Sequence, residues 1–297
     1  MKTKHLRLMQ RAYVILFFCF MYLPIAYMVV FSFNQSKGYA LFTGFTFKWY
    51  TSLLHNESIL HALWVSLYLA LFSAVIATVL GTAASLGIAS MGRKSRLLVT
   101  NITYITTVNP EIITGISLML LFVAYQRFAG GLDFLPDSIM GLPTLLIAHI
   151  MFCIPYVMLS VTPKLRSLDP NLIDAAMDLG ATPFQALAKV IVPQIKPGII
   201  SGALIAFTMS FDDFVISYFT TGNGVNNISI LVYTMSKRVN PSINALSTIV
   251  ILLITLVLGV VNIVPIVREK REKDGKASRA VSRKAMAAVA AVLVLAV

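Results

Sequence analysis

Three of the twelve acidic residues lie inside long apolar runs: Glu111 in TTVNPEIITG, and Asp212 with Asp213 in FTMSFDDFVIS. A carboxylate in the middle of a membrane costs on the order of a few kcal/mol, so we expect each to face a cavity, a partner or a substrate. Ser210 adds a hydroxyl beside the aspartates, and these runs contain no Lys or Arg. Their composition favours a cationic ligand.

Each acid could instead have a structural role, either as a protonated group or as a hydrogen-bonding partner of another helix. This alternative is strongest for Asp213, which points about 100° away from Asp212 on a regular helix. Pro110 should kink the helix of Glu111 and free carbonyl groups at the same depth. Aromatic side chains nearby could hold a cation against their ring faces, although packing is the commoner role: Tyr104, Tyr125, Phe211, Phe214 and Tyr218.

The sequence contains no pattern typical of a catalytic or metal site. The four histidines have no metal-ligand spacing, and both cysteines lie in apolar runs. The string GIASMGRKS at 87–95 departs from the phosphate-binding loop because Arg93 displaces the lysine, and because it ends a helix. We therefore expect no catalytic residue, metal or cofactor in this chain, and ATP must be handled by another chain.

The elements that position these residues are predicted to be membrane helices. Of the 297 residues, 58% are AVILMFWYC and 12% are charged, about half the usual charged share, which excludes an ordinary soluble protein. Six apolar runs without the alternation of a barrel are long enough to cross about 30 Å of hydrocarbon. We predict an all-α polytopic membrane protein with six core helices: 13–33, 62–88, 102–125, 142–161, 199–219 and 246–267.

The charge distribution predicts the topology. Of 24 Lys and Arg, 19 lie in residues 1–12 and in the connections 92–101, 162–198 and 268–284, which places these segments and the N-terminus in the cytoplasm. The net charge of +12 therefore reports topology and not a nucleic-acid partner. Trp49 then precedes the second span on the outer side, where a belt residue is commoner than a ligand contact.

The connection 162–198 carries signals for helix ends. Asp169 can cap a first helix that Gly180 ends, and Thr182 with Gln185 forms a capping box for a second. We expect a pair of short helices, parallel to the membrane, that dock in a groove of a soluble partner. The alternative is a solvated linker with amphipathic helices.

This connection resembles the EAA loop of the inner-membrane permeases of bacterial ABC importers, in which three residues separate EAA from Gly and nine more precede IxLP. The sequence has Asp for Glu at the first position and VIVP at 190–193. In that family the loop is the coupling helix in a cleft of the ATPase subunit. The resemblance therefore implies ATPase coupling by Asp174, Ala175, Ala176, Gly180 and Pro193.

Motifs over most of the chain resemble the second permease subunit of the spermidine/putrescine importers. They are FSFNQS at 31–36, FTFKWY at 45–50, NPEI at 109–112, SFDDFVISYFTTG at 210–222 and NALSTI at 244–249. The resemblance implies a substrate pathway that includes Trp49, Glu111, Ser210, Asp212 and Asp213, with Glu111 in place of an Asp.

The same resemblance implies a bacterial inner-membrane permease that forms half of a polyamine pathway. Its partners would be a second permease subunit in a heterodimer, two ATPase subunits that use ATP and magnesium, and an extracytoplasmic polyamine-binding protein. The choice between putrescine and spermidine stays open. The alternative function, an ion-coupled secondary transporter of organic cations, should show an internal repeat with matching broken spans, which the sequence lacks.

The predicted organisation has four parts: a cytoplasmic N-terminus at 1–12, the permease domain at 13–267, a basic cytoplasmic linker at 268–284, and an apolar segment at 285–297. The last segment, AMAAVAAVLVLAV, is too short to span the bilayer. We interpret it as the start of a seventh helix that tethers a fused binding domain outside. The alternative is a tail at the membrane surface.

Overall fold

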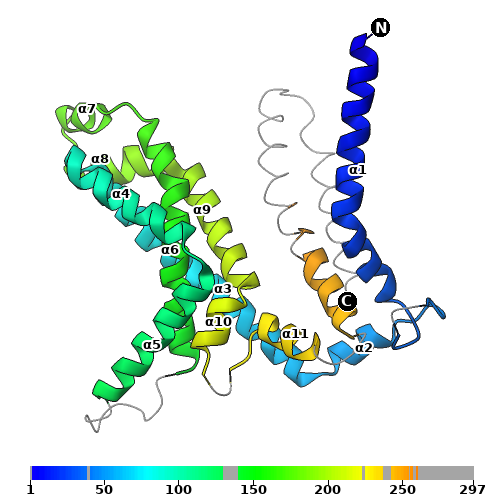
Figure 1. Ribbon diagram of the computed structural model, residues 1–297. Coiled ribbons are helices and arrows are strands. Elements are labelled where there is room, and N and C mark those ends of the chain that lie inside the picture. Colours follow the sequence, from blue (N-terminus) through cyan, green and yellow to red (C-terminus); the bar gives the residue numbers. More distant parts are fainter. Residues whose placement is uncertain are drawn as a thin grey trace, which may run out of the picture. The chain divides into compact units, whose positions relative to one another are not determined.

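The computed structural model describes residues 2–38, 41–129, 140–222, 225–236, 242–253, 255–256 and 259. Apart from one isolated antiparallel bridge between Asn34 and Phe45, its regular structure is helical in these residues. The chain divides into two compact units (Figure 1), which are described separately. The first unit contains Met1–Asn56 and Met235–Val297, and the second contains Glu57–Thr234.

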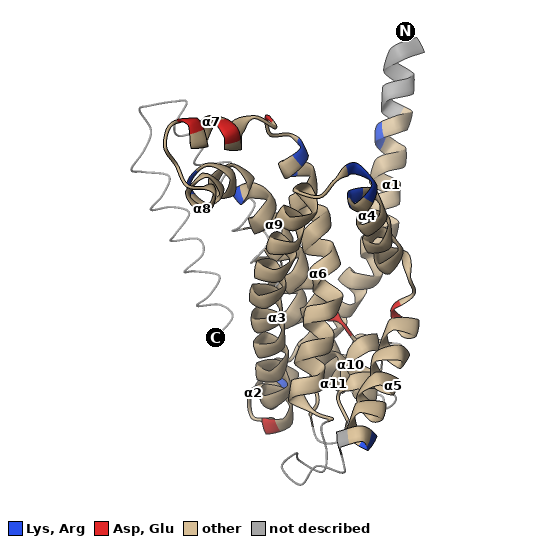
Figure 2. Cartoon of the chain, turned by 90° about the vertical axis from the view of Figure 1, so that its left-hand side faces the viewer, with Lys and Arg blue, Asp and Glu red and all other residues tan. Residues whose placement is uncertain are grey.

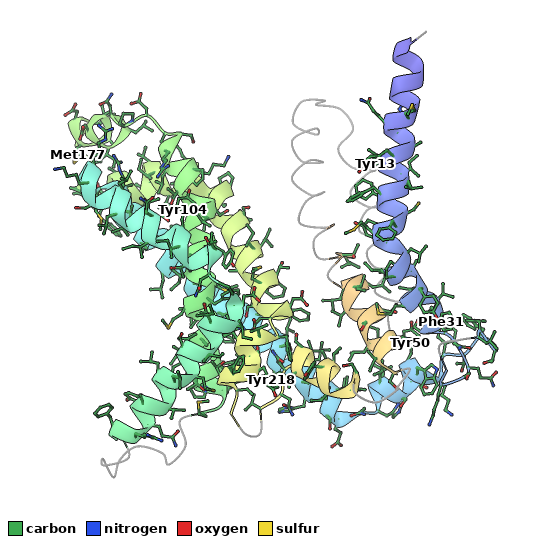
Figure 3. All side chains as sticks on the ribbon, in the orientation of Figure 1. Tyr13, Phe31, Tyr50, Tyr104, Met177 and Tyr218 are labelled. Atoms are coloured by element: carbon green, nitrogen blue, oxygen red, sulfur yellow. The ribbon has the colours of Figure 1, made fainter. Side chains whose placement is uncertain are left out.

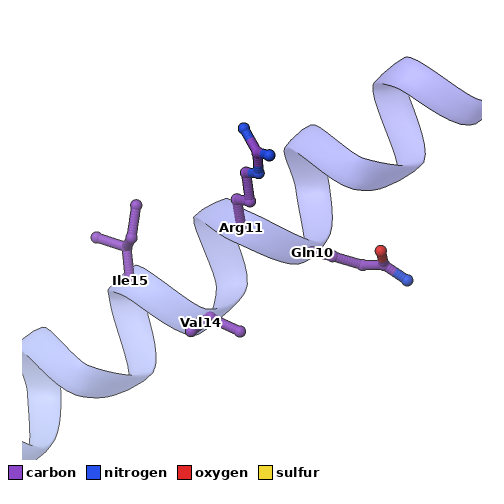
Figure 4. A pocket seen from close by; sticks show the side chains of 4 residues that line it. All are labelled: Gln10, Arg11, Val14 and Ile15. Atoms are coloured by element: carbon purple, nitrogen blue, oxygen red, sulfur yellow. The ribbon is translucent and has the colours of Figure 1, made fainter. Parts of the chain in front are cut away.

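The first unit contains α1 (Lys2–Phe31), α2 (Lys48–Leu54) and a shorter apolar helix at 242–253. Within α1, the segment Met9–Phe31 is long and apolar enough to cross a membrane. Figure 4 shows the four residues that line a shallow hollow on α1, the polar Gln10 and Arg11 and the apolar Val14 and Ile15. All four side chains come from one helix, so the hollow is ordinary helix surface and no binding site.

The second unit is built around three long helices, α3 (Glu57–Ala89), α6 (Leu142–Arg166) and α9 (Val192–Asp212), which pack against one another. Its buried core contains small and branched side chains, which let the helix backbones approach closely: Ala74, Ala77, Cys153, Val157, Val161, Ile191, Ile195 and Ala206. The all-helical membrane fold is confirmed. Five helices of the described residues are long enough to span, and the sixth predicted span is represented by the shorter helix 242–253.

The predicted span 102–125 is divided into two helices. α4 (Arg93–Val108) ends at Asn109, whose backbone is extended, and α5 (Glu111–Ala129) begins after Pro110. Proline has no N–H for a helical hydrogen bond, and its ring disfavours the helical conformation of the preceding residue. The predicted kink is therefore a complete break.

The predicted span 199–219 is wrong at both ends. A continuous helical segment runs from Pro183 to Asp212, through α8 (Pro183–Ala186), a π-helical turn at Leu187–Ile191, and α9. It stops at Asp213, whose backbone is extended, and the chain restarts as α10 (Val215–Thr220). α11 (Ile228–Ser236) follows. The early start arises because the second predicted coupling helix joins the span.

The connection 162–198, called the coupling segment from here on, contains one short helix before Gly180, α7 (Leu172–Asp178). It begins two residues later than a cap at Asp169 implies, and Asp169 Oδ1 instead accepts a hydrogen bond from the backbone N–H of Asn171 at 2.9 Å. The capping box of Thr182 and Gln185 is confirmed, with hydrogen bonds of 3.3 and 3.1 Å. The expected pair of short helices is wrong, because the capped second helix continues into α9.

One end of the second unit contains the start of α4, the end of α6 and the coupling segment (Figures 1 and 2). Both connections 92–101 and 162–198, predicted to be cytoplasmic, therefore share one side of this unit. Basic residues of α4 and α6 and acidic residues of α7 lie at this end in Figure 2. The segments 268–284 and 285–297 lie outside the described residues, so the predicted linker and seventh helix stay predictions.

Candidate substrate pathway and coupling segment

Two helix breaks carry the membrane acids. Glu111 is the first residue of α5, and Asp212 is the last residue of α9. Both side chains are exposed. Because each acid sits at a helix end, nearby backbone groups are left without helical partners, and the chain there can present a polar surface at membrane depth.

The two breaks are brought together by the packing of α5 against α10. At Gly115 the helices approach so closely that an added Cβ would lie 3.1 Å from Phe219 Cδ2 and 3.5 Å from Ile216 Cα. Glu111 lies one helical turn before Gly115, and Asp213 and Asp212 lie three and four residues before Ile216, so this close approach brings the two breaks into one region. The structure therefore groups three predicted pathway acids.

Asp213 differs from the other two acids because it is buried, with 6% of its surface exposed. Its Oδ1 accepts a hydrogen bond from the backbone N–H of Ile216 at 3.2 Å. Its Oδ2 accepts from the backbone N–H and the hydroxyl of Ser217, at 2.8 and 2.9 Å. The carboxylate therefore caps the start of α10, which is a common use of Asp at a helix N-terminus.

A buried histidine on α6 joins the two sides of the α9–α10 break. His149 is 1% exposed, and its Nδ1 lies 2.7 Å from the Ser210 hydroxyl on α9. Its Nε2 lies 2.9 Å from the Ser217 hydroxyl on α10 and 3.5 Å from Asp213 Oδ2. Ser73 on α3 extends the network with a 2.8 Å hydrogen bond to Ser210.

Asn227 closes the network from the start of α11. Its side-chain amide donates to the Ser217 hydroxyl at 2.7 Å and to the Asp213 carbonyl at 3.3 Å. Its Oδ1 accepts from the backbone N–H of Ile230 at 2.9 Å, which caps α11. One amide thus fixes the start of α11 to the start of α10.

Four members of this network were not predicted from the sequence: Ser73, His149, Ser217 and Asn227. His149 lies in a predicted span, and an ionisable residue there is a candidate for function by the same reasoning that applies to Glu111. The serines and Asn227 carry no comparable signal, because single hydroxyls and amides are ordinary in membrane helices. In the part of the chain that the structure describes, no cluster of His, Cys, Asp and Glu could hold a metal ion.

Two of the aromatic candidates lie beside the break. The ring centroids of Phe214 and Tyr218 are 5.5 Å apart, and Tyr233 of α11 is 4.6 Å from Phe214. Figure 3 marks Tyr218, which is half exposed. Phe211 is instead buried, stacked on Phe207. Tyr104 and Tyr125 are exposed on α4 and α5.

Trp49 belongs to the first unit, where it is 7% exposed. Its indole N–H donates to the Asn34 carbonyl at 2.7 Å. The Tyr50 hydroxyl lies 2.6 Å from that of Ser32, near the end of α1 (Figure 3). Trp49 therefore packs against the loop that follows α1. Its part in the substrate pathway stays a prediction.

The coupling residues lie on an exposed segment. Asp174, Ala175 and Ala176 belong to α7, which has no buried residue, and Figure 3 labels Met177 beside them. Gly180 has φ +88°, a left-handed conformation that favours glycine. The large apolar side chains Leu179 and Phe184 are 90% and 77% exposed. Leu179 and Phe184 therefore present apolar surface on either side of the Gly180 turn.

A cavity of about 480 Å³ adjoins α7, and Asp169, Ile173, Leu187 and Ile191 are among the residues that line it.

Pro193 follows the π-helical turn in the second position of α9. Since Pro193 has no N–H to offer to the carbonyl of Lys189, and its ring crowds that carbonyl, a widened turn relieves the clash.

Comparison with known proteins agrees with this architecture. Residues 77–265 match the family described as "Binding-protein-dependent transport system inner membrane component". The putrescine transport system permease protein PotI of Escherichia coli K12 is 39% identical over 241 residues, covering 80% of this chain and 84% of PotI. The spermidine/putrescine transport system permease protein PotC of the same strain is 34% identical over 247 residues, covering 83% and 89%.

Solved structures support the fold. A chain of a bacterial ABC transporter that imports the acidic polysaccharide alginate superposes with a TM-score of 0.69 at 17% identity, over 86% of this chain and 92% of that chain. A chain of the MetNI methionine ABC transporter gives a TM-score of 0.55 at 21% identity, over 72% and 98%.

These matches confirm the resemblance to polyamine importer permeases and the prediction of a transport subunit that is not an enzyme. They also decide against an ion-coupled secondary transporter, and they support a multi-pass protein of the inner membrane. The chain belongs to the family of binding-protein-dependent inner-membrane components, the permease subunits of ABC importers.

Proposed function

We propose that this chain is the permease subunit of an ATP-driven polyamine importer and forms half of its translocation pathway. The observation that carries the proposal is the grouping of Glu111 and Asp212, two exposed carboxylates at adjacent helix breaks. Residues 199–222 contain no Lys or Arg that would neutralise them. The similarity to PotI and PotC supports the same substrate class.

The chemistry of a polyamine suits this arrangement. Its ammonium groups donate hydrogen bonds to carboxylates, and such charge-assisted bonds contribute about 1.5 to 3 kcal/mol each. Phe214, Tyr218 and Tyr233 offer ring faces beside the acids, which attract cations and pack against methylene groups. Ser210 and Asp213 support the acids from the buried side, and Trp49 acts in the outer part of the pathway.

The complete importer requires other chains. A second permease subunit completes the pathway as a heterodimer, and an extracytoplasmic polyamine-binding protein, separate or fused, delivers the substrate. Two ATPase subunits bind ATP and magnesium and dock on the coupling segment through Asp174, Ala175, Ala176, Gly180 and Pro193. This arrangement places the N-terminus in the cytoplasm. The exposed apolar side chains beside α7 support the docking of a partner there.

Uptake of labelled putrescine and, separately, spermidine by vesicles that contain the assembled importer tests the proposal. Asp212→Asn and Glu111→Gln each remove a negative charge at nearly constant shape, and we expect uptake to fall about 10-fold while assembly is unchanged. Glu57→Gln, an exposed acid at the start of α3, is the matched control and should keep the original rate. Unchanged uptake in both pathway variants would contradict the proposal.

A further inference from the structure

We propose that His149 is a positioning residue for the transport site. By holding Ser210 and Ser217 on the two sides of the α9–α10 break, it fixes which of the two adjacent aspartates faces the pathway. This inference rests on the proposed function, in which Asp212 contacts the polyamine.

The backbone at the α9–α10 break lacks the hydrogen bonds of a continuous helix. A regular helix fixes the direction of each side chain through its i to i−4 hydrogen bonds, and these are lost where α9 ends. The imidazole of His149 lies across this gap, at 2.7 Å from Ser210 Oγ and 2.9 Å from Ser217 Oγ. Because α6 packs against both α9 and α10, the ring is held from outside the break.

Because residues 212 and 213 are both aspartate, something outside the break must determine which of them faces the pathway. Asp212 and Asp213 have the same side chain, so either could cap α10 if α9 ended one residue earlier or later. In the structure Asp213 is the cap and Asp212 is exposed. A shift by one residue would bury Asp212 and leave the pathway with a carboxylate in a different place.

The network distinguishes the two arrangements because only Asp213 meets its donors. With the proton on Nε2, His149 donates to Ser217, which donates to Asp213 Oδ2, while Ser210 donates to Nδ1 and Ser73 donates to Ser210. The hydroxyls of Ser210 and Ser217 then each act as acceptor and donor, and this chain of donors ends at the Asp213 carboxylate. Buried polar networks with all members satisfied specify one arrangement strongly.

The first experiment substitutes His149 in the assembled importer. His149→Leu removes both ring hydrogen bonds at similar volume, and His149→Gln keeps a donor and an acceptor on one side chain. Cys153→Ala, one turn along α6 and also buried, is the matched control outside the network. We measure maximal polyamine uptake against the concentration of loaded binding protein, and assembly by size-exclusion chromatography.

We expect His149→Leu to lower maximal uptake about 10-fold, which corresponds to the loss of about one buried hydrogen-bonded link. His149→Gln should recover part of the rate, and Cys153→Ala should stay within about twofold of the original, since it removes only a small buried volume. Original uptake in His149→Leu would overturn the proposal.

The second experiment separates positioning from general stability by adding Asp212→Asn to each background. If His149 acts through Asp212, the substitution Asp212→Asn lowers uptake about 10-fold in the original chain and less than about twofold beside His149→Leu. If His149→Leu and Asp212→Asn instead lower uptake by independent factors that multiply, the positioning role is wrong and the proposed function stands. If Asp212→Asn has no effect in the original chain, the proposed contact between Asp212 and the polyamine is wrong.

A second network variant covers the case in which His149→Leu does not assemble. Ser217→Ala removes the hydroxyl that links His149 to Asp213 while the backbone N–H of residue 217 can still bond the carboxylate. The same cycle with Asp212→Asn then applies, with the same expected non-additivity. Independent effects in that cycle overturn the proposal.

Discussion

The α4–α5 break and the α9–α10 break both interrupt a predicted membrane span and both place an acid at a helix end, but different forces produce them. At the first, Pro110 cannot continue the helix, and the side-chain bond that crosses the break, from Asn109 to Thr114 at 3.2 Å, is exposed. At the second, the sequence contains no proline, and a buried carboxylate replaces the backbone bonds.

The two breaks are sensitive to substitutions in different places. A break made by proline depends on covalent geometry at one residue, so distant substitutions should leave it in place. The break at Asp213 depends on side chains from α3, α6, α10 and the start of α11, so substitutions far away in sequence should move it.

The largest effect is expected for Asp213→Ala. It leaves the N–H groups of Ile216 and Ser217 without their acceptor in a buried site, and losing such a cap costs about 2 kcal/mol, or roughly 30-fold in an equilibrium. We expect a lower unfolding temperature of the purified complex and uptake reduced about 30-fold. Asp213→Asn keeps one acceptor oxygen and should lose less. Equal losses in both variants would show that the cap is not the cause.

A smaller effect is expected for Gly115→Leu, which forces α5 away from α10. The added side chain meets Phe219 and the backbone of Ile216, and such overpacking costs about 1 to 3 kcal/mol. Uptake should fall about 10-fold because the acids at the two breaks separate. Gly87→Leu on α3 is the control, since an added Cβ there meets no atom within 4 Å. Similar uptake in the two variants would contradict the role of this contact.

A third break, the turn after α7, depends on the backbone of Gly180. Gly180→Pro requires φ near −65° where the structure has +88°, and it removes the hydrogen bond of 2.8 Å from Gly180 N–H to the Met177 carbonyl. We expect substrate-stimulated ATPase activity of the assembled importer to fall about fivefold, at a strain of about 1 kcal/mol or more. Gly180→Asn tolerates the left-handed conformation and should keep most of the stimulation. Unchanged stimulation with proline would remove the turn from the coupling mechanism.

The smallest effect is expected for Pro110→Ala. It restores a backbone N–H and lets α4 join α5, but the packing of α5 on α10 at Gly115 keeps Glu111 beside the acids of the second break. We expect a change in uptake of about twofold or less, since proline substitutions act largely through local backbone preference. A loss as large as that of Asp213→Ala would erase the contrast between the two breaks.

Local signals in the sequence predicted much of this molecule. The apolar runs, Pro110, the left-handed Gly180 and the capping box of Thr182 and Gln185 each act within a few residues, so the sequence reveals them directly. The acids Glu111 and Asp212 were recognisable because a charge in an apolar run is rare.

The rest depended on tertiary contacts that no local pattern encodes. The end of α9 at Asp213 follows from hydrogen bonds to Ser217 and from His149, which lies 64 positions earlier in the chain. The continuity of the second coupling helix with α9 was not predicted, and a proline such as Pro193 ordinarily kinks or ends a helix. In the structure the π-helical turn at Leu187–Ile191 accommodates it.

That uninterrupted segment has a mechanical consequence. Pro183–Asp212 comprises 30 residues, about 45 Å at the rise of a helix, and it begins beside Gly180 and ends at the acid pair. A displacement at Phe184 would be passed toward Asp212 along one helical segment that crosses no loop. The π-helical turn at Leu187–Ile191 lies near the Phe184 end, so the segment would bend there first, while α9 carries the movement on to Asp212.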